Sequence, residues 1–437
     1  MKIVRPLAAI VIAIPFMVPA PVSATGGYWS LGFGTRSKGM AGAGAAIGLD
    51  ALSAGVNPAS MALTPDRLDL GLALFFPDRG FTADEVPASQ NCPPTGPNQP
   101  GCIPPGEYRS KNPLFMIPSF GWSKSLDAES TIGISIGGNG GMNTEYDSAV
   151  FRNYANPANP KTMPTGATGI DLSQMFIGGT YTRKTAEHQW VGVTPVIGIQ
   201  NLKVKGLEPF TSMSESPDNV TGQGYDWSYG YGLRLGWLGE FSDQWSLGAS
   251  YQTRIYMSKF EKYKGLLAEQ GDFDIPPTLV VGLGYKTTPN VTLVLDYQKI
   301  WYSDVRSLSN TNLPSSPKFN LGGADGLGFG WKDQDIFKLG VQWKYSTDLT
   351  LRGGYAHASK VFDGSNAFFN LLAPATVQDH VTCGFSYRIS EKDEISGSLM
   401  HAFSKRVPGS NPMFSGAQTG SVEMSQTELE LSWGRRF

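Results

Sequence analysis

The chain has 437 residues, of which 16% are charged, 11% are aromatic and 53 are glycine, and its formal net charge is −2. Soluble domains carry about 25% charged residues and nucleic-acid-binding proteins carry a basic excess, so the composition argues against both classes. No run after residue 24 approaches 18 apolar residues, which excludes a bundle of membrane-spanning helices.

Residues 1–24 are organised like a secretory signal peptide. Lys2 and Arg5 form a charged start, residues 7–18 are apolar, and the small residues "VSA" place the expected cleavage after Ala24. The apolar stretch is too short and too interrupted by proline to span a bilayer as a helix, although a retained anchor is the alternative. Cleavage leaves 437 − 24 = 413 residues.

Residues 25–65 are rich in glycine and alanine, and within 39–63 the only charged side chain is Asp50. Asp50 can cap a short helix, and Pro58 restricts Asn57 to an extended or turn conformation. A segment of this kind can pack closely, and when enclosed it must satisfy its own backbone polar groups. We expect a compact, enclosed unit; a soluble tail outside the main fold is the alternative.

From residue 67 onward, apolar and polar residues alternate with a period of two, as in strands with one apolar face. In "YDWSYGYGLRLGW", 225–237, one phase is entirely aromatic or leucine and the other is polar or glycine. The aromatic residues at both ends match the two interfacial girdles of a membrane strand of about 9–11 residues. Fourteen segments follow the pattern and begin near Arg67, Pro113, Ser130, Asp171, Gln189, Tyr225, Trp245, Pro277, Val291, Ile336, Leu349, His380, Glu394 and Glu423.

The connections between these segments alternate in length. Six short turns lie at 125–129, 183–188, 239–243, 286–290, 345–348 and 390–393. Seven long loops lie at 77–112, 143–170, 203–224, 257–276, 301–335, 357–379 and 404–422. This alternation is typical of up-and-down membrane barrels, and an even strand number leaves no unpaired edge in lipid. We predict an all-β fold, a fourteen-stranded antiparallel transmembrane β-barrel over residues 66–437 in a bacterial outer membrane.

Two cysteines flank the proline-rich loop "PPTGPNQPG". Secreted proteins seldom leave such thiols free, so we predict a disulfide between Cys92 and Cys102; two unpaired loop thiols are the alternative. Cys383 stands alone inside a predicted strand, where we expect an inert apolar residue.

The third predicted strand contains "TIGISIGGNGGMNTEY", 131–146. Its isoleucines alternate, and then four glycines interrupt the pattern: Gly137, Gly138, Gly140 and Gly141. Glycines inside a strand mark bulges, kinks or close backbone approach. The alternative is a glycine-rich strand end that leads into a loop.

Two of the long loops carry apolar side chains. In 257–276 they recur at helical spacing, and in 203–224 they surround a Glu-Pro step; the residues are Leu207, Phe210, Phe260, Tyr263, Leu266 and Leu267. An apolar face on an outer loop suggests a surface that collects hydrophobic molecules. A loop that buries these side chains against itself is the alternative.

Neither catalysis nor metal binding is indicated. "GISIG" matches the nucleophile elbow around Ser135, but the elbow needs a strand-to-helix turn, which the pattern lacks. The histidines 188, 357, 380 and 401 lack metal-ligand spacing. We predict no catalytic residue, no metal site and no cofactor; an outer-membrane lipase that uses Ser135 is the alternative.

The chain ends with "ELELSWGRRF", in which Leu429, Leu431, Trp433 and Phe437 share one face. This resembles the terminal strand by which outer-membrane barrels are recognised for assembly. The barrel assembly machinery is therefore an expected partner.

The N-terminal region resembles the FadL family of outer-membrane transporters of long-chain fatty acids and other hydrophobic compounds. The resemblance rests on "GTRSKGMAGAG", 34–44, on "DALSAGVNPASM", 50–61, and on the strand that follows at once. It implies that residues 25–65 form a hatch that plugs the barrel, with Asn57, Pro58 and Ala59 as its motif. It also implies that the glycines of the third strand open the wall beside the hatch, and that the third and fourth outer loops capture ligand.

The family's mechanism implies passive diffusion: capture by loops, binding in the lumen, and lateral release into the bilayer. The implied partners are a hydrophobic small molecule, outer-membrane lipid and lipopolysaccharide, and no nucleic acid. Arg234, Arg254 and Lys338 fall on lumen phases and could contact a fatty acid carboxylate. A hydrocarbon channel of the same fold and a general diffusion porin are the alternatives.

Overall fold

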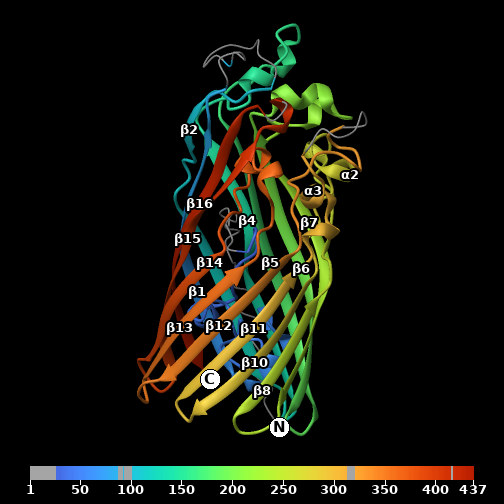
Figure 1. The fold of residues 1–437 in the computed structure, drawn as a ribbon. Helices are drawn as coiled ribbons and strands as arrows, with labels where there is room; N and C mark the ends of the chain where they lie inside the picture. The colour runs from blue at the N-terminus through green and yellow to red at the C-terminus, as the bar shows by residue number, and fades with distance from the viewer. Residues whose placement is uncertain (1–25, 87–91, 93–100, 313–319, 415–416) are drawn as a thin grey trace.

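The computed structural model describes residues 26–86, 92, 101–312, 320–414 and 417–437. The predicted signal peptide lies outside these residues. The described chain forms one tall barrel with long connections at its upper end and short turns at its lower end (Figure 1).

One antiparallel sheet makes the wall. Within the described residues it holds sixteen strands, of which β2 (Gly106–Arg109) and β9 (Tyr256–Met257) are short additions, so 16 − 2 = 14 strands form the barrel. These are β1 (Arg67–Ala83), β3 (Phe115–Ser125), β4 (Ser130–Tyr146), β5 (Thr168–Ala186), β6 (Gln189–Lys205), β7 (Asp226–Glu240), β8 (Trp245–Gln252), β10 (Thr278–Thr288), β11 (Val291–Ile300), β12 (Gln334–Lys344), β13 (Leu349–Ala358), β14 (Asp379–Arg388), β15 (Asp393–Ser410) and β16 (Thr419–Arg436).

The barrel is closed by its first and last strands. β1 pairs with β16 from Arg67↔Arg436 to Ala83↔Gly420, so the described sheet closes on itself and neither its first nor its last strand is left as a free edge. The predicted fold class is therefore confirmed, and every predicted strand start lies within about four residues of the observed one. The predictions succeed because one face of each strand meets lipid and the other faces the lumen, which forces apolar and polar residues to alternate along the strand.

Strand β7 shows this alternation most clearly. Leu235 and Tyr231 are exposed on the outer face, whereas Ser228 and Arg234 are buried on the inner face. In a bilayer the outer face meets hydrocarbon, which explains why a single strand carries arginine on one face and only leucine and aromatic residues on the other.

We expect Leu235→Arg to reduce the folded yield of the barrel. Leu235 is 46% exposed on the outer face, and an arginine near the bilayer midplane costs about 2–4 kcal/mol. The measurement is unfolding by denaturant in liposomes, with Leu235→Ala as the control for the lost side chain. Equal stability of the two variants would show that Leu235 does not face lipid.

The helices are short and lie in the N-terminal segment and the upper connections. They are α1 (Thr35–Lys38), α2 (Ala268–Gly271), α3 (Arg306–Ser309) and the 3₁₀ turns η1 (Ser53–Gly55), η2 (Pro58–Leu63), η3 (Arg152–Tyr154), η4 (Pro160–Thr162), η5 (Glu208–Met213), η6 (Pro217–Asn219), η7 (Glu261–Tyr263), η8 (Tyr302–Asp304), η9 (Gly364–Asn366), η10 (Phe369–Leu371) and η11 (Pro412–Phe414). None of the helices in the described ranges is long and apolar enough to cross a membrane.

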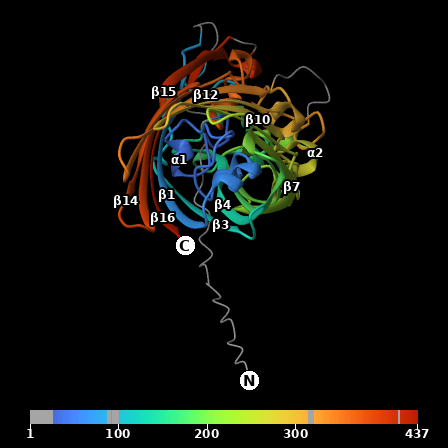
Figure 2. The same cartoon turned by 90° about the horizontal axis from the view of Figure 1, so that it is seen from below.

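The N-terminal segment, residues 26–65, lies inside the barrel and is called the hatch below. Figure 2 shows it, with α1, enclosed by the ring of strands. Most of its side chains are buried. Above it, towards the outer loops, the main apolar core of the molecule fills the upper lumen.

Candidate functional site

Asn57 joins the hatch to the wall. Its backbone is extended, and its side-chain oxygen accepts a hydrogen bond from Ala59 N at 3.0 Å, which caps η2. Its amide nitrogen donates to Ala45 O at 2.7 Å and to Trp237 O of β7 at 3.0 Å. Pro58 restricts Asn57 to this conformation. The Asn57-Pro58-Ala59 motif thus begins a 3₁₀ helix and links two parts of the hatch to the barrel.

Wall glycines let the hatch backbone come this close. A Cβ at Gly248 would lie 2.0 Å from Ala45 O, and a Cβ at Gly236 would lie 2.1 Å from Asn57 Oδ1. No side chain fits at such distances. The glycines of the polar phase of β7 and β8 are therefore docking positions for the hatch.

Buried ion pairs fix α1 of the hatch to β15 and β16. Lys38 Nζ lies 2.9 Å from Glu428 Oε1 and 2.7 Å from Glu430 Oε2. Arg36 pairs with Glu394, and Thr35 donates to Glu430 at 2.9 Å. Each carboxylate is largely removed from water, and leaving it unpaired there would be costly, so these pairs stabilise the docked hatch. In the sequence this contact is only weakly indicated: Glu428 and Glu430 occupy the lumen phase of the last strand and alternate with outward-facing leucines.

A small cavity lies between the hatch and the wall. It is lined by Trp29, Ser30, Leu31, Gly32, Phe33, Gly55, Val56, Arg234, Ser250, Gln252, Thr278, Val280, Gln298 and Lys338. It leaves about 20 Å³ for the centre of a water molecule, which is room for about one water. A hydrophobic ligand can occupy this position only if the side chains around the cavity move.

The lumen cations named from the sequence are already engaged. Arg234 donates to Ala54 O at 3.2 Å and lies 5.5 Å from the centre of the Phe33 ring. Lys338 Nζ donates to Leu31 O at 2.9 Å. Both cations therefore hold the hatch backbone, and a ligand carboxylate would have to compete with carbonyl oxygens for them.

Aromatic side chains from the hatch and the outer loops form a cluster above the hatch. The ring centre of Tyr28 lies 5.4 Å from Tyr302, 5.9 Å from Trp331 and 6.3 Å from Phe273. All four rings are buried. Trp29, the next hatch residue, packs on Phe176 of β5 at 6.0 Å. This aromatic cluster makes the interior of the upper lumen apolar and rich in aromatic rings.

Strand β4 carries a bulge at the predicted glycines. Its pairing with β5 shifts between Gly138 and Gly140, so Asn139 is the extra residue. Asn139 is fully buried, and its amide donates to Gln174 at 3.0 Å. From residue 139 to 144 every residue of β4 is buried, so both faces of the strand are covered by protein there and it has no lipid-facing side.

The wall is interrupted next to this bulge. β3 pairs with β4 from Ser125↔Thr131 only as far as Ser119↔Gly137, although β3 continues to Phe115. We call the interruption the seam; its edges are residues 112–118 and residues 138–144. Pro118 has no N–H to offer a partner strand, as is usual at an edge.

The hatch covers the seam from inside. Ser30 N donates to Asn139 O at 2.6 Å, Gly141 N donates to Tyr28 O at 3.1 Å, and Trp29 and Gly140 form an antiparallel bridge. Tyr28 and Trp29 thus take the place of the missing wall strand. The sequence could not identify Asn139 as the bulge, because the pattern alone does not say which residue of "GGNGG" is unpaired.

Both faces of the seam are suited to an apolar ligand. On the outside, Leu114 and Met116 of the β3 edge are exposed, so the seam opens towards lipid. On the inside, a Cβ at Gly137 would meet no heavy atom within 4 Å. Gly137 shares its phase with Gly133, whose Cβ would touch Met61 of the hatch, so this open space lies in the lumen.

The six apolar loop residues predicted to capture ligand are all buried. Each has at most 7% exposure, and they belong to the core that fills the upper lumen. The self-packed alternative is the arrangement in this structure. The helical spacing of 259–270 does not give one helix: η7 ends at Tyr263 and α2 begins at Ala268. Inside α2, Glu269 and Gln270 have φ of 56° and 61°, outside the helical range.

The same outer loop is tied down by charge. Arg254 Nε lies 2.6 Å from Asp274 Oδ2, and Arg254 Nη2 lies 3.4 Å from Asp272 Oδ2. Burial and then Asp274 raise the pKa of Asp272 to about 6, with Arg254 acting in the opposite direction. The third cation named from the sequence is thus paired with loop carboxylates.

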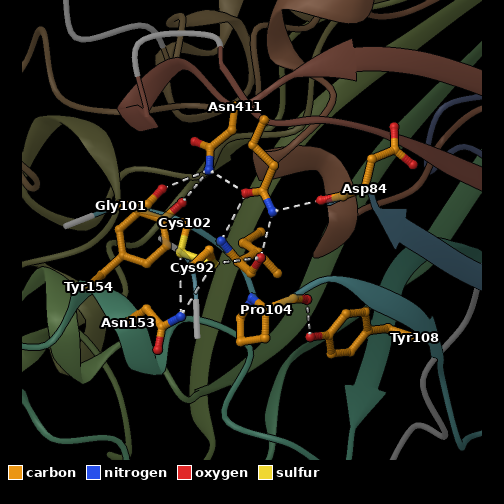
Figure 3. Close-up of a disulfide and its surroundings, with 11 residues drawn as sticks. Asp84, Cys92, Gly101, Cys102, Pro104, Tyr108, Asn153, Tyr154 and Asn411 are labelled. Carbon is orange, nitrogen blue, oxygen red and sulfur yellow. Dashed lines mark hydrogen bonds between the residues drawn. A yellow bond between two sulfur atoms is a disulfide. The ribbon is translucent and has the colours of Figure 1, made fainter. Parts of the chain in front are cut away.

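Cys92 and Cys102 form a disulfide with a Cα–Cα distance of 6.1 Å (Figure 3). Asn153 donates from Nδ2 to both sulfurs, at 3.6 and 3.4 Å. Asn411 donates to Gly101 O at 2.7 Å. The first outer loop is therefore fastened to the second and the last, and the three together cover the upper end of the barrel.

No group of three or more potential metal ligands occurs within the described ranges. Ser135 lies in the middle of β4, without the strand-to-helix turn of a nucleophile elbow. His357 contacts Asp379 at 2.7 Å, and both are partly exposed on the barrel exterior. His380 is buried on the opposite face of β14, as expected for the neighbour of Asp379.

Residues 20–428 match the family model of an outer membrane protein transport protein (OMPP1/FadL/TodX). The chain is similar in structure to the toluene transporter TodX of Pseudomonas putida, with 18% identity, a TM-score of 0.68, and coverage of 93% of this chain and 99% of that one. The FadL homologue of Pseudomonas aeruginosa gives 15% identity, a TM-score of 0.67, and coverage of 94% and 100%. The toluene transporter TbuX of Ralstonia pickettii gives 18% identity, a TM-score of 0.59, and coverage of 93% and 99%. No curated protein sequence matches the chain.

Proposed function

The chain belongs to the OMPP1/FadL/TodX family of outer membrane transport proteins, and on that premise we propose that it lets neutral hydrocarbons diffuse through the outer membrane by a lateral route. Transport of hydrophobic compounds and the outer-membrane location follow from the family. The choice of ligand and the route are the proposal.

One observation carries the route. Tyr28 and Trp29 belong to the aromatic cluster, and the same two residues pair with β4 at the seam. A ligand that displaces them passes from a ring-lined interior to Leu114 and Met116 on the lipid side without crossing water. Hydrating apolar surface costs about 25 cal/mol per Å², so such a route is favoured over an aqueous pore.

The side chains that line the upper lumen favour one class of ligand. Aromatic pairs contribute about 0.5–1.5 kcal/mol beyond simple burial, which favours ligands with rings. Arg234 and Lys338 bind hatch carbonyl oxygens, and Arg254 binds loop carboxylates, so a fatty acid head group would have to displace existing partners. The structural neighbours TodX and TbuX are toluene transporters, which supports the same choice. Long-chain fatty acids are the second candidate.

Lateral diffusion needs no energy source, and we assign the chain no catalytic role. We divide it into a signal peptide (1–24), the hatch (25–65) and the barrel (66–437). The exposed apolar belt is proposed to contact outer-membrane lipid and lipopolysaccharide, and the terminal strand with Phe437 to engage the barrel assembly machinery. A general diffusion porin is disfavoured because the hatch fills the lumen.

The test is extraction of bound ligands from the purified full-length protein, followed by mass spectrometry and by competition between toluene and oleate. We expect neutral hydrocarbons to be recovered from cells grown with them, and toluene to compete at least as well as oleate. Consistent recovery of fatty acids alone would replace the hydrocarbon proposal with the fatty acid one.

A further inference from the structure

The upper end of the seam is closed without strand pairing. Among the described residues, the backbone contacts between the two edges resume only where Lys111 N donates to Glu145 O at 2.9 Å. Below that point the seam runs down to the pair Ser119↔Gly137. At about 3.3 Å per residue, edges of this length could separate far enough to pass large molecules unless something holds them together.

One arginine from a third strand does so. Arg79 lies on the inner face of β1, which pairs with β3 and not with β4. Its guanidinium nevertheless donates to the backbone oxygens of Asn143 on one edge and Asn112 on the other. It also donates to Asn143 Oδ1 at 3.2 Å. A single side chain thus binds backbone oxygens of both edges, beside a direct hydrogen bond from Asn112 Nδ2 to Asn143 Oδ1 at 3.1 Å.

The surroundings of Arg79 fit no simpler role. Its side chain is 1% exposed, and no carboxylate among the described residues forms an ion pair with it. The guanidinium lies 5.4 Å from the centre of the Phe115 ring. Burying a cation without an anion is costly. What offsets this cost is two hydrogen bonds to carbonyl oxygens across the seam, one from each terminal nitrogen of the guanidinium fork.

We propose that Arg79 is the upper stop of the seam and that it limits the size of the ligand that leaves sideways. This rests on the proposed lateral route. Arg79 and Asn112 share Asn143 Oδ1 as an acceptor, so loss of the guanidinium leaves one side-chain hydrogen bond between the edges at this point. The next backbone closure is Lys111–Glu145, one or two residues or about 3–7 Å further up. Arg79 therefore discriminates by size between slim and bulky hydrocarbons.

The experiment compares uptake of toluene and pyrene by proteoliposomes or cells that carry Arg79→Lys or Arg79→Ala. Lysine keeps the charge but has a single terminal nitrogen in place of the two that bind one carbonyl oxygen each. We expect the ratio of pyrene to toluene uptake to rise about threefold or more in both variants, which corresponds to about 0.7 kcal/mol in relative barriers. Arg352→Lys is the matched control, because Arg352 is a buried lumen arginine on β13 that donates to Gln342 and Ser386.

An unchanged ratio in folded Arg79→Lys protein would overturn the role of Arg79. If Arg79→Ala fails to fold, Arg79→Lys decides alone, with the folded fraction measured by heat-dependent gel mobility. A block of the seam at Gly137 separates the two proposals. If Gly137→Phe stops uptake but the Arg79 variants leave the pyrene-to-toluene ratio unchanged, the size limit is wrong and the lateral route stands. If Gly137→Phe leaves uptake normal, the lateral route itself is wrong.

Discussion

Gly137→Phe is expected to lower uptake of hydrophobic ligand about tenfold or more, a barrier increase of at least about 1.4 kcal/mol, with the folded yield unchanged. Gly137 faces the lumen beside the seam, and an added Cβ meets no heavy atom within 4 Å. The added side chain starts in lumen space that is open around its Cβ, and it narrows the path along which we propose that a ligand turns towards lipid. The measurement is the initial rate of toluene uptake at equal amounts of folded protein.

The matched control is Gly179→Phe on the neighbouring strand. Gly179 of β5 pairs with Ile134 of β4 and is exposed on the outer face. A Cβ there also meets nothing within 4 Å, so the same side chain is added on the lipid side of the wall. Normal uptake by the Gly179 variant together with normal uptake by the Gly137 variant would remove the support for a lateral exit.

Lys38→Met is expected to release the hatch. The change leaves Glu428 and Glu430 buried against the hatch without the cation that lies within 3 Å of both. Breaking such a pair costs about 3–5 kcal/mol. We expect this loss to weaken the binding of the hatch to β16 and not the pairing of the barrel strands. We expect faster proteolysis of residues 26–65 in the purified protein and larger ion conductance through the lumen, while the β-sheet signal persists.

The triple variant Lys38→Met, Glu428→Gln, Glu430→Gln serves as the control. It removes the charges together, so we expect it to recover much of the protection against protease, because no carboxylate is left unpaired. Equal protection of the single variant and the unmodified chain would show that these ion pairs do not hold the hatch.

The strands were predictable because their constraints are local. Each wall residue faces either lipid or lumen, and the alternation in 225–237 gives the face of Leu235 and of Arg234 correctly. The lengths of the connections then distinguish the end of the barrel with short turns from the end with long loops. The disulfide loop and the enclosed, nearly uncharged N-terminal segment could likewise be predicted from local composition and spacing.

The site was predictable only in outline. The glycines of β4 indicated a bulge, but that Asn139 is the extra residue follows from its pairing with β5 and from Ser30 of the hatch. Arg79 belongs to an ordinary strand pattern, and its role depends on Asn112 and Asn143, which lie 33 and 64 residues away. Contacts of this range leave no periodic signal.

The loops differ from expectation for a related reason. Apolar side chains at helical spacing, such as Phe260 and Leu267, predict a helix with an exposed apolar face. The loops instead pack on one another, and both residues are buried. Competition among several loops for the same apolar core decides their conformation, and a single loop sequence does not contain that information.

The most direct test of the lateral route is photolabelling with a neutral hydrocarbon that carries a diazirine, added outside cells that express the full chain. The route through the seam predicts adducts on Phe115 and Met142, which are buried beside the seam and out of reach of a probe dissolved in lipid. Adducts on Ile47 and Leu63, at the lower end of the hatch, with none along the seam would show that ligands pass straight through the barrel and would contradict the account.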